Sequence, residues 1–122
     1  MLLFAVAAAG FAGALARFWL GGYIAAKLGT PFPWGTFVIN ITGAVSLGLL
    51  TGLAGRGSVS PDLRTVIGTG FLGAYTTFST WTLETVRLMQ SGSYRLALAN
   101  IGLSALTGLL AAGCGLALSG HF

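Results

Sequence analysis

The chain has 122 residues, of which 55% are hydrophobic and only 7% are charged, and its net charge is +4. A soluble domain carries about 25% charged residues, so this composition excludes an ordinary water-soluble domain and indicates an integral membrane protein. The positive charges are spread along the chain with no basic run, which disfavours nucleic-acid binding. The N-terminus has no basic segment ahead of its apolar residues, so we expect no cleaved signal peptide.

Apolar segments long enough to cross ~30 Å of hydrocarbon occur four times. We predict an all-α membrane protein whose spans cover about residues 2–26, 34–54, 61–89 and 96–118. Short links rich in glycine, proline and serine separate these segments. The whole chain, residues 1–122, is therefore predicted to be one four-span transmembrane domain without a soluble domain.

Small residues recur every four positions in the second and fourth spans, a pattern typical of closely packed membrane helices. The second span contains the stripe Asn40, Ala44, Gly48 and Gly52. The fourth span contains Asn100, Ser104, Gly108 and Ala112. We expect most of each stripe to pack against another helix, and the asparagine and serine positions to be the functional ones.

The third span begins at Ser60-Pro61-Asp62, which reads as an N-cap, a first-turn proline and a first-turn acid. Its middle differs from the other spans, because three glycines precede four hydroxyl side chains that compete for backbone hydrogen bonds. These residues are Gly68, Gly70, Gly73, Thr76, Thr77, Ser79 and Thr80. The pattern favours a break in the helix, which would expose carbonyl and amide groups that can coordinate ions. The alternative is a continuous helix whose hydroxyls bond to its own carbonyls.

The charges in the links barely specify an orientation in the membrane. The side with both termini carries Arg56 and Arg64. The other side carries Lys27, Arg87 and Arg95, joined by Arg17 if that side chain reaches the same interface. A bias of two against three or four is weak. We infer that the chain inserts in both orientations, which makes an antiparallel homodimer possible.

Catalysis has little support, and we predict that the chain is not an enzyme. It has one histidine, one cysteine and two acids, and they form no acid pair, metal-ligand set or nucleophile–base pair. Neutral groups that donate hydrogen bonds are abundant inside the predicted spans, and they suit an anion better than a proton-coupled cation. They are Thr36, Asn40, Thr42, Ser46, Thr76, Thr77, Ser79, Thr80, Asn100 and Ser104. Phe78 and Trp81 lie three residues apart, where they either pack or present electropositive ring edges to an anion.

Several segments along the whole chain carry a family resemblance. They are Gly10-Phe11-Ala12-Gly13-Ala14-Leu15-Ala16-Arg17-Phe18, Gly35-Thr36 through Asn40 and Gly43, Gly70-Phe71-Leu72-Gly73, Thr76-Thr77-Phe78-Ser79-Thr80 with Glu84, and Ser104 with Gly108. In these segments the chain resembles the Fluc/CrcB family of fluoride channels. The resemblance implies a dual-topology antiparallel homodimer in a lipid bilayer, with two pores and a central Na⁺ on the two-fold axis.

The resemblance also implies roles for particular residues. Main-chain carbonyls of Gly73 and Thr76 would hold the Na⁺. The fluoride path would be lined by Asn40, Phe78, Ser79, Thr80, Trp81 and Ser104. A position at a vestibule or a structural role would fall to Arg17, Thr36 and Glu84. Many members have Phe where this chain has Trp81, and Tyr where it has Asn100, so the roles of these two positions are open.

Three functions follow as hypotheses. The first is passive export of fluoride across the inner (plasma) membrane of a prokaryote. The second is a proton-coupled small multidrug transporter, which requires a carboxylate inside the membrane, whereas the first span has Arg17 and no acid. The third is an assembly subunit of a larger membrane complex, which would rarely need a polar seam inside a span.

Overall fold

The computed structural model describes all 122 residues, and every regular element in it is helical. Three long α-helices are α1 (Leu2–Leu28), α2 (Trp34–Gly55) and α6 (Tyr94–Leu118), and a 3₁₀ turn η2 (Ser119–His121) follows α6. Between α2 and α6 the chain forms α3 (Pro61–Arg64), the π-helix η1 (Thr65–Leu72), α4 (Gly73–Tyr75) and α5 (Ser79–Gln90). The first three of these form one continuous helical segment, residues 61–75.

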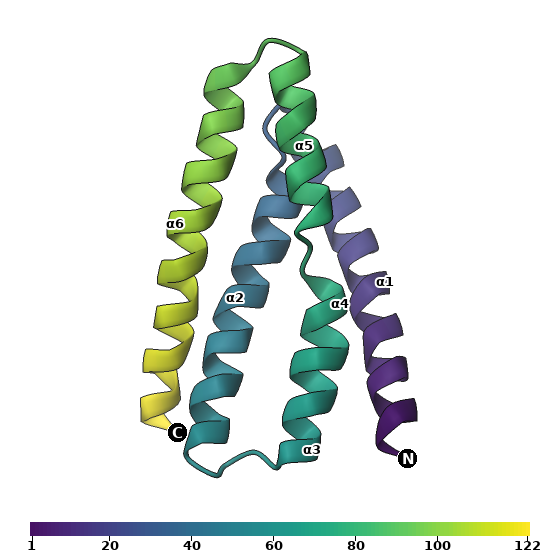
Figure 1. Cartoon of the computed structure of the whole chain (residues 1–122), viewed down its shortest axis with the longest axis vertical. Helices are drawn as coiled ribbons and strands as arrows, with labels where there is room; N and C mark the ends of the chain where they lie inside the picture. The colour runs from purple at the N-terminus through teal and green to yellow at the C-terminus, as the bar shows by residue number, and fades with distance from the viewer.

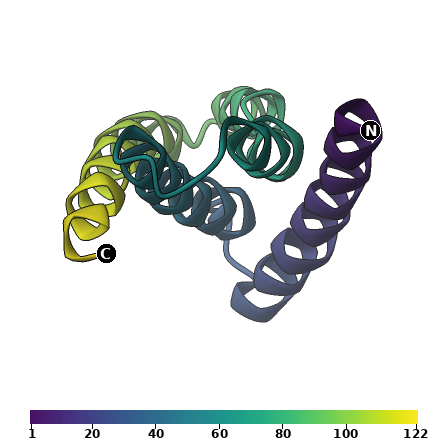
Figure 2. The same ribbon diagram turned by 90° about the horizontal axis from the view of Figure 1, so that it is seen from below.

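The chain runs back and forth four times along one long axis. Both termini and the link between α2 and α3 lie at one end, and the links α1–α2 and α5–α6 lie at the other (Figure 1). Viewed from the end that carries the termini, α1 stands to one side and α6 to the other, with α2 and the divided pass between them (Figure 2). The helices α1, α2 and α6–η2 are each long and apolar enough to cross a membrane, whereas the remaining pass is divided into two shorter pieces.

Local signals account for the helix ends. Gly29 adopts a left-handed conformation (φ 55°, ψ 26°), and its N–H bonds to the Ala25 carbonyl, which ends α1 just before Pro31. At the start of α3 the Ser60 hydroxyl accepts a hydrogen bond from the Leu63 N–H at 3.3 Å, with Pro61 as the first helical residue. The predicted start of the third pass at Ser60-Pro61-Asp62 is confirmed.

The helices α2 and α6 pack backbone against backbone in their halves nearest the termini. A Cβ atom added at Gly48 would collide with the Ala112 carbonyl, and one at Gly115 would collide with the Val45 carbonyl. A Cβ at Gly52 would collide with the Ser119 side chain. Glycine is therefore required at this seam by close approach, as the stripe in the second span predicts.

The stripe predicted for the fourth span is only partly correct. A Cβ at Gly108 would meet nothing within 4 Å, so this glycine does not pack. The buried positions of α6 are Asn100, which belongs to the predicted stripe, and Ala97, Ala111 and Gly115, which do not; Ser119 of η2 is also buried. Close approach on α6 therefore involves Ala112 and Gly115 but not Gly108.

The π-helix η1 lies against α1. A Cβ at Gly13 would collide with the Phe71 carbonyl, and one at Gly70 would lie within 3.0 Å of Ala9 and the Val6 carbonyl. The Gly73 N–H bonds back to the Gly68 carbonyl, five residues earlier, as the wider turn of a π-helix requires. The divided pass is thus held on α1 by close backbone contact on the terminal side of the break.

Most of the surface of the single chain is apolar. Only 19 of its 122 residues are buried, while large side chains such as Phe11, Trp19 and Leu109 are more than 70% exposed. A chain in water would not leave this much apolar surface uncovered. The fold therefore needs lipid or another protein surface around it, in agreement with the predicted membrane location.

The seam between α2 and α6 gives a stability test with an internal control. Gly48→Ala is expected to lower the free energy of unfolding by about 1–3 kcal/mol, because the added methyl group must displace the Ala112 carbonyl. Gly108→Ala is expected to be neutral or slightly stabilising, because alanine favours helix and space is available. Thermal unfolding in detergent measures the difference in stability between the two variants. Equal melting temperatures would contradict close packing of α2 against α6 at Gly48.

Candidate functional site

The third pass is interrupted at residues 76–78, near its middle. The helical segment 61–75 ends where Thr76 turns to an extended conformation (φ −77°, ψ 160°), and α5 starts again at Ser79. The break lies between α4 and α5 in Figure 1. This confirms the broken third helix, and the continuous-helix alternative is wrong.

The side chain of Asn40 on α2 binds both polar groups of the Thr77 main chain. Its Nδ2 donates to the Thr77 carbonyl at 2.9 Å, and its Oδ1 accepts from the Thr77 N–H at 2.9 Å. The break removes the helical partners of these two groups, and leaving each unpaired away from water costs about 1–3 kcal/mol. Asn40 therefore replaces the missing helical bonds from outside the helix.

The Thr77 side chain completes the break from the other direction. Its hydroxyl oxygen accepts a hydrogen bond from the Thr80 N–H at 3.2 Å, and the hydroxyl donates to the Thr80 Oγ1 at 3.0 Å. Thr77 is buried and lies one residue before the N-cap position Phe78, and its hydroxyl pairs a first-turn N–H of α5 as a threonine cap does. The sequence places Thr77 among the buried donors but does not identify it as a site residue; the spacing Thr77-x-x-Thr80 was the available signal.

Carbonyl groups at the end of the first half-helix lack their usual donors. The Thr77 N–H bonds to Asn40, and neither Thr77 nor Phe78 donates a backbone hydrogen bond, so the helical ladder does not reach the carbonyls of Gly73 and Ala74. The Thr76 carbonyl likewise accepts no backbone hydrogen bond. Free carbonyls at a helix C-terminus carry partial negative charge and favour a cation. Gly73 and Thr76 therefore have the chemistry that a Na⁺ held by main-chain oxygens requires.

Phe78 and Trp81 lie side by side at the start of α5. Their ring centroids are 5.3 Å apart and the rings are inclined at 54°. The Phe78 side chain is 75% exposed, whereas the Trp81 indole is half-buried and donates its Nε1–H to the Asn100 carbonyl at 3.1 Å. The indole N–H of Trp81 is therefore already paired, and within the side chain only the ring faces are available to a ligand.

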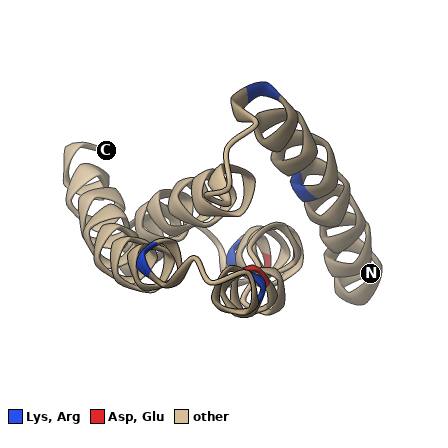
Figure 3. Ribbon diagram, turned by 90° about the horizontal axis from the view of Figure 1, so that it is seen from above, with Lys and Arg blue, Asp and Glu red and all other residues tan.

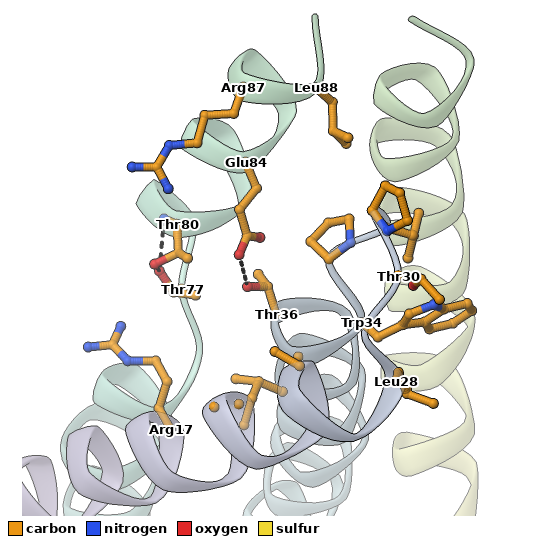
Figure 4. A pocket seen from close by; sticks show the side chains of 18 of the residues that line it. Arg17, Leu28, Thr30, Trp34, Thr36, Thr77, Thr80, Glu84, Arg87 and Leu88 are labelled. Atoms are coloured by element: carbon orange, nitrogen blue, oxygen red, sulfur yellow. Dashed lines mark hydrogen bonds between the residues drawn. The ribbon is translucent and has the colours of Figure 1, made fainter. Parts of the chain in front are cut away.

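A cavity of about 780 Å³ lies between α1, the start of α2 and α5, on the side of the break away from the termini. It is lined by all three residues predicted for a vestibule or structural role, Arg17, Thr36 and Glu84, and by Thr77, Thr80 and Arg87 among others (Figure 4). The Glu84 Oε1 accepts a hydrogen bond from the Thr36 hydroxyl at 2.9 Å, while its Oε2 is buried without a partner. The sequence did not indicate Arg87 as a site residue, because it looked like an interfacial charge.

Charged residues are otherwise sparse. Seen from the end opposite the termini, the Lys, Arg, Asp and Glu positions are few and are distributed over several helices (Figure 3). No group of three or more His, Cys, Asp or Glu side chains is placed to hold a metal ion. The break itself presents main-chain groups, hydroxyls, an amide and aromatic rings, while Arg17, Glu84 and Arg87 line the adjoining cavity.

The remaining predicted site residues lie around the same break. Ser79 Oγ is 3.5 Å from the Thr77 hydroxyl, and Ser104 lies on α6 beside Asn100, with a 3.4 Å hydrogen bond between their side chains. The structure thus connects Asn40 to Ser79 and Thr80 through Thr77, and it places Phe78 beside Trp81. It connects Ser104 to them only through the contact between α5 and α6.

The fold and this site define a class: a small, multi-pass helical membrane protein with a broken helix at its centre. The family model for "CrcB-like protein, Camphor Resistance (CrcB)" matches residues 4–116. The chain therefore belongs to the CrcB-like family, which confirms the resemblance seen in the sequence.

Curated bacterial relatives align along nearly the whole chain. The fluoride-specific ion channel FluC 1 of Symbiobacterium thermophilum is 51% identical over 115 residues, which is 93% of each chain. FluC 1 of Leifsonia xyli is 47% identical over 121 residues, or 98% of this chain and 88% of the relative. FluC of Acidobacterium capsulatum is 48% identical over 112 residues, or 91% of this chain and 90% of the relative.

Removal of the Asn40 amide tests its role in the break. Asn40→Leu keeps the approximate size of the side chain but leaves the Thr77 N–H and carbonyl without partners, so we expect amide hydrogen exchange over residues 76–80 to accelerate about tenfold or more. Ser46→Ala is the matched control on α2, because the Ser46 hydroxyl donates only to its own helix at the Thr42 carbonyl. Equal exchange in the two variants would contradict the role of Asn40.

Proposed function

We propose that the chain is a fluoride-selective channel that lets fluoride leave the cell passively and so lowers its cytoplasmic concentration and toxicity. The observation that carries the proposal is the break at residues 76–78, where Asn40 hydrogen-bonds the Thr77 main chain. This break occurs in a chain whose relatives are named fluoride-specific ion channels. The transported species is the fluoride ion, and the protein works as a multi-pass protein of the inner (plasma) membrane of a prokaryote.

The polar groups at the break suit a small, strongly hydrated anion. Fluoride enters a pore only if hydrogen-bond donors replace part of its water, and neutral hydroxyls and amides do so without binding it too tightly to leave. The N-terminus of α5 also faces the break and contributes partial positive charge. The proposed path is lined by Asn40, Phe78, Ser79, Thr80, Trp81 and Ser104, with Arg17, Thr36 and Glu84 at its vestibule.

The working unit in this proposal is an antiparallel homodimer with two pores. Support comes from the weak charge asymmetry of the links and from the large apolar surface of the single chain. The exposed ring of Phe78 would face the partner subunit or the pore. A Na⁺ on the two-fold axis would be held by the carbonyls of Gly73 and Thr76, where it supplies positive potential without a basic side chain in the path.

One observation favours the proton-coupled transporter as a second candidate. Glu84 is a carboxyl group within the divided pass, and its Oε2 has no hydrogen-bond partner. Such a group is what proton exchange in a membrane requires. However, Arg17 and Arg87 line the same cavity, and two guanidinium groups favour an anion over an organic cation.

The proposal is tested by fluoride efflux from liposomes that contain the purified protein. We expect rapid release of fluoride and retention of chloride, because small polar donors interact more strongly with the smaller ion. Liposomes without protein give the leak rate. Retained fluoride with a folded, inserted protein would overturn the proposal.

Substitution of Phe78 tests the proposed path. Phe78→Ile removes the electropositive ring edge and is expected to lower fluoride efflux about tenfold or more while leaving the protein assembled. Phe4→Ile is a matched control, because Phe4 is exposed to a similar degree at the start of α1, 78% against 75% for Phe78. If Phe78→Ile conducts like the control, Phe78 lies outside the path.

Glu84→Gln separates the two candidate functions. The transporter hypothesis predicts proton-driven uptake of an organic cation by the unmodified protein and loss of that uptake in the variant. The channel proposal predicts no such uptake by either protein. Uptake that depends on Glu84 would replace the channel proposal with the transporter.

A further inference from the structure

The contact between α5 and α6 contains a fully buried amide. The Asn100 side chain is 0% exposed, its Nδ2 donates to the Thr85 hydroxyl oxygen at 2.9 Å, and its Oδ1 accepts from the Ser104 hydroxyl at 3.4 Å. A buried amide within a membrane span is destabilising unless its polar atoms are paired. The position of Asn100 is therefore determined by hydrogen bonds as well as by packing.

These bonds form a chain with one direction. The Thr85 hydroxyl donates its single hydrogen to the Trp81 carbonyl at 2.8 Å, so its oxygen is left to accept from Asn100. The Trp81 indole donates in the opposite direction, to the Asn100 main-chain carbonyl at 3.1 Å. Asn100 is thus bonded to α5 through its main-chain carbonyl and its Nδ2. Its Oδ1 makes no bond to α5 and accepts from the Ser104 hydroxyl.

The bond to Ser104 is the weakest of the chain. At 3.4 Å it is longer than the 2.5–3.0 Å that O–H···O hydrogen bonds usually span. Ser104 is half-buried, whereas Asn100 and Thr85 are buried, so Ser104 is the more exposed of the three hydrogen-bonded side chains. A hydrogen bond to an anion is roughly twice as strong as one between neutral groups. An arriving anion therefore competes well with Asn100 for the Ser104 hydrogen.

We propose that Asn100 is a positioning residue of the anion path. Its fixed amide oxygen orients the Ser104 hydroxyl toward the α5–α6 contact, and the Ser104 hydroxyl then donates its hydrogen to fluoride when the ion arrives. This proposal rests on the proposed function, which places Ser104 on the path. Asn100 acts through Ser104 and does not touch the ion. Trp81 and Thr85 serve the same arrangement by fixing the amide.

A double-mutant cycle in liposomes tests this role. Asn100→Leu removes both polar groups of the amide at similar size, and we expect it to lower fluoride efflux about fivefold, the effect of one lost hydrogen bond. In a Ser104→Ala background the same substitution is expected to lower efflux less than about twofold, because the group it positions is already absent. An equal loss in both backgrounds means that Asn100 only supports the structure, and it overturns the proposal.

A milder variant keeps the test decisive if Asn100→Leu does not assemble. Thr85→Val removes the acceptor of the Asn100 amide with little change of shape, and it is expected to lower efflux with Ser104 present but not in Ser104→Ala. Thr107→Val is the matched control, since the Thr107 hydroxyl donates to the Leu103 carbonyl of its own helix. Additive losses for Thr85→Val, or an equal loss in the Thr107 control, would overturn the proposal.

The parent protein separates this inference from the proposed function. Absence of fluoride efflux from the parent contradicts both, whereas fluoride efflux from the parent with an additive cycle contradicts only the role of Asn100. As an independent readout, Trp81 can be made the only tryptophan by Trp19→Phe and Trp34→Phe. Its emission is expected to shift when Asn100→Leu loosens the contact, and an unchanged spectrum would argue that the amide does not hold α5 on α6.

Discussion

The pairing of the Asn40 amide with the Thr77 main chain is the constraint on which the rest of the structure depends. Asn40 supplies a donor to the Thr77 carbonyl and an acceptor to the Thr77 N–H, each at 2.9 Å, where the backbone makes no helical hydrogen bonds. Hydrocarbon offers no substitute for these bonds. With this pairing in place, free carbonyls at the end of α4 can lie before the break, and the start of α5 with its hydroxyls can lie after it.

Close backbone contacts bring the partners of the break within reach. A Cβ at Gly43 would collide with the Thr76 methyl group, so α2 approaches the break one turn after Asn40 at a distance that only glycine permits. Gly13 and Gly70 bring α1 against η1 in the same way. The glycine-rich composition thus serves the polar centre, because helices that pack closely hold a two-bond amide contact in a fixed place.

Much of this arrangement could be predicted from the sequence, since it follows from local patterns. The four apolar passes, the start at Ser60-Pro61-Asp62 and the break after Gly73 are visible as composition and spacing. The π-helix and the failure of the stripe at Gly108 were not visible, because both depend on how α1 and α6 approach their neighbours. The pairing of Asn40 with Thr77 joins residues 37 positions apart, so no local pattern predicts it. The family resemblance pointed to Asn40 for the pore, whereas the structure also gives it a part in holding the break.

The central claim is that Asn40 both holds the break and leaves it suitable for an anion. Fluoride efflux through Asn40→Asp tests it most directly, because the substitution keeps an acceptor for the Thr77 N–H but replaces the donor to the Thr77 carbonyl with a second oxygen. The account predicts that efflux falls to the leak rate of protein-free liposomes when the aspartate is ionised and the protein remains assembled. Efflux equal to that of the parent protein, with a demonstrably ionised aspartate, would contradict it.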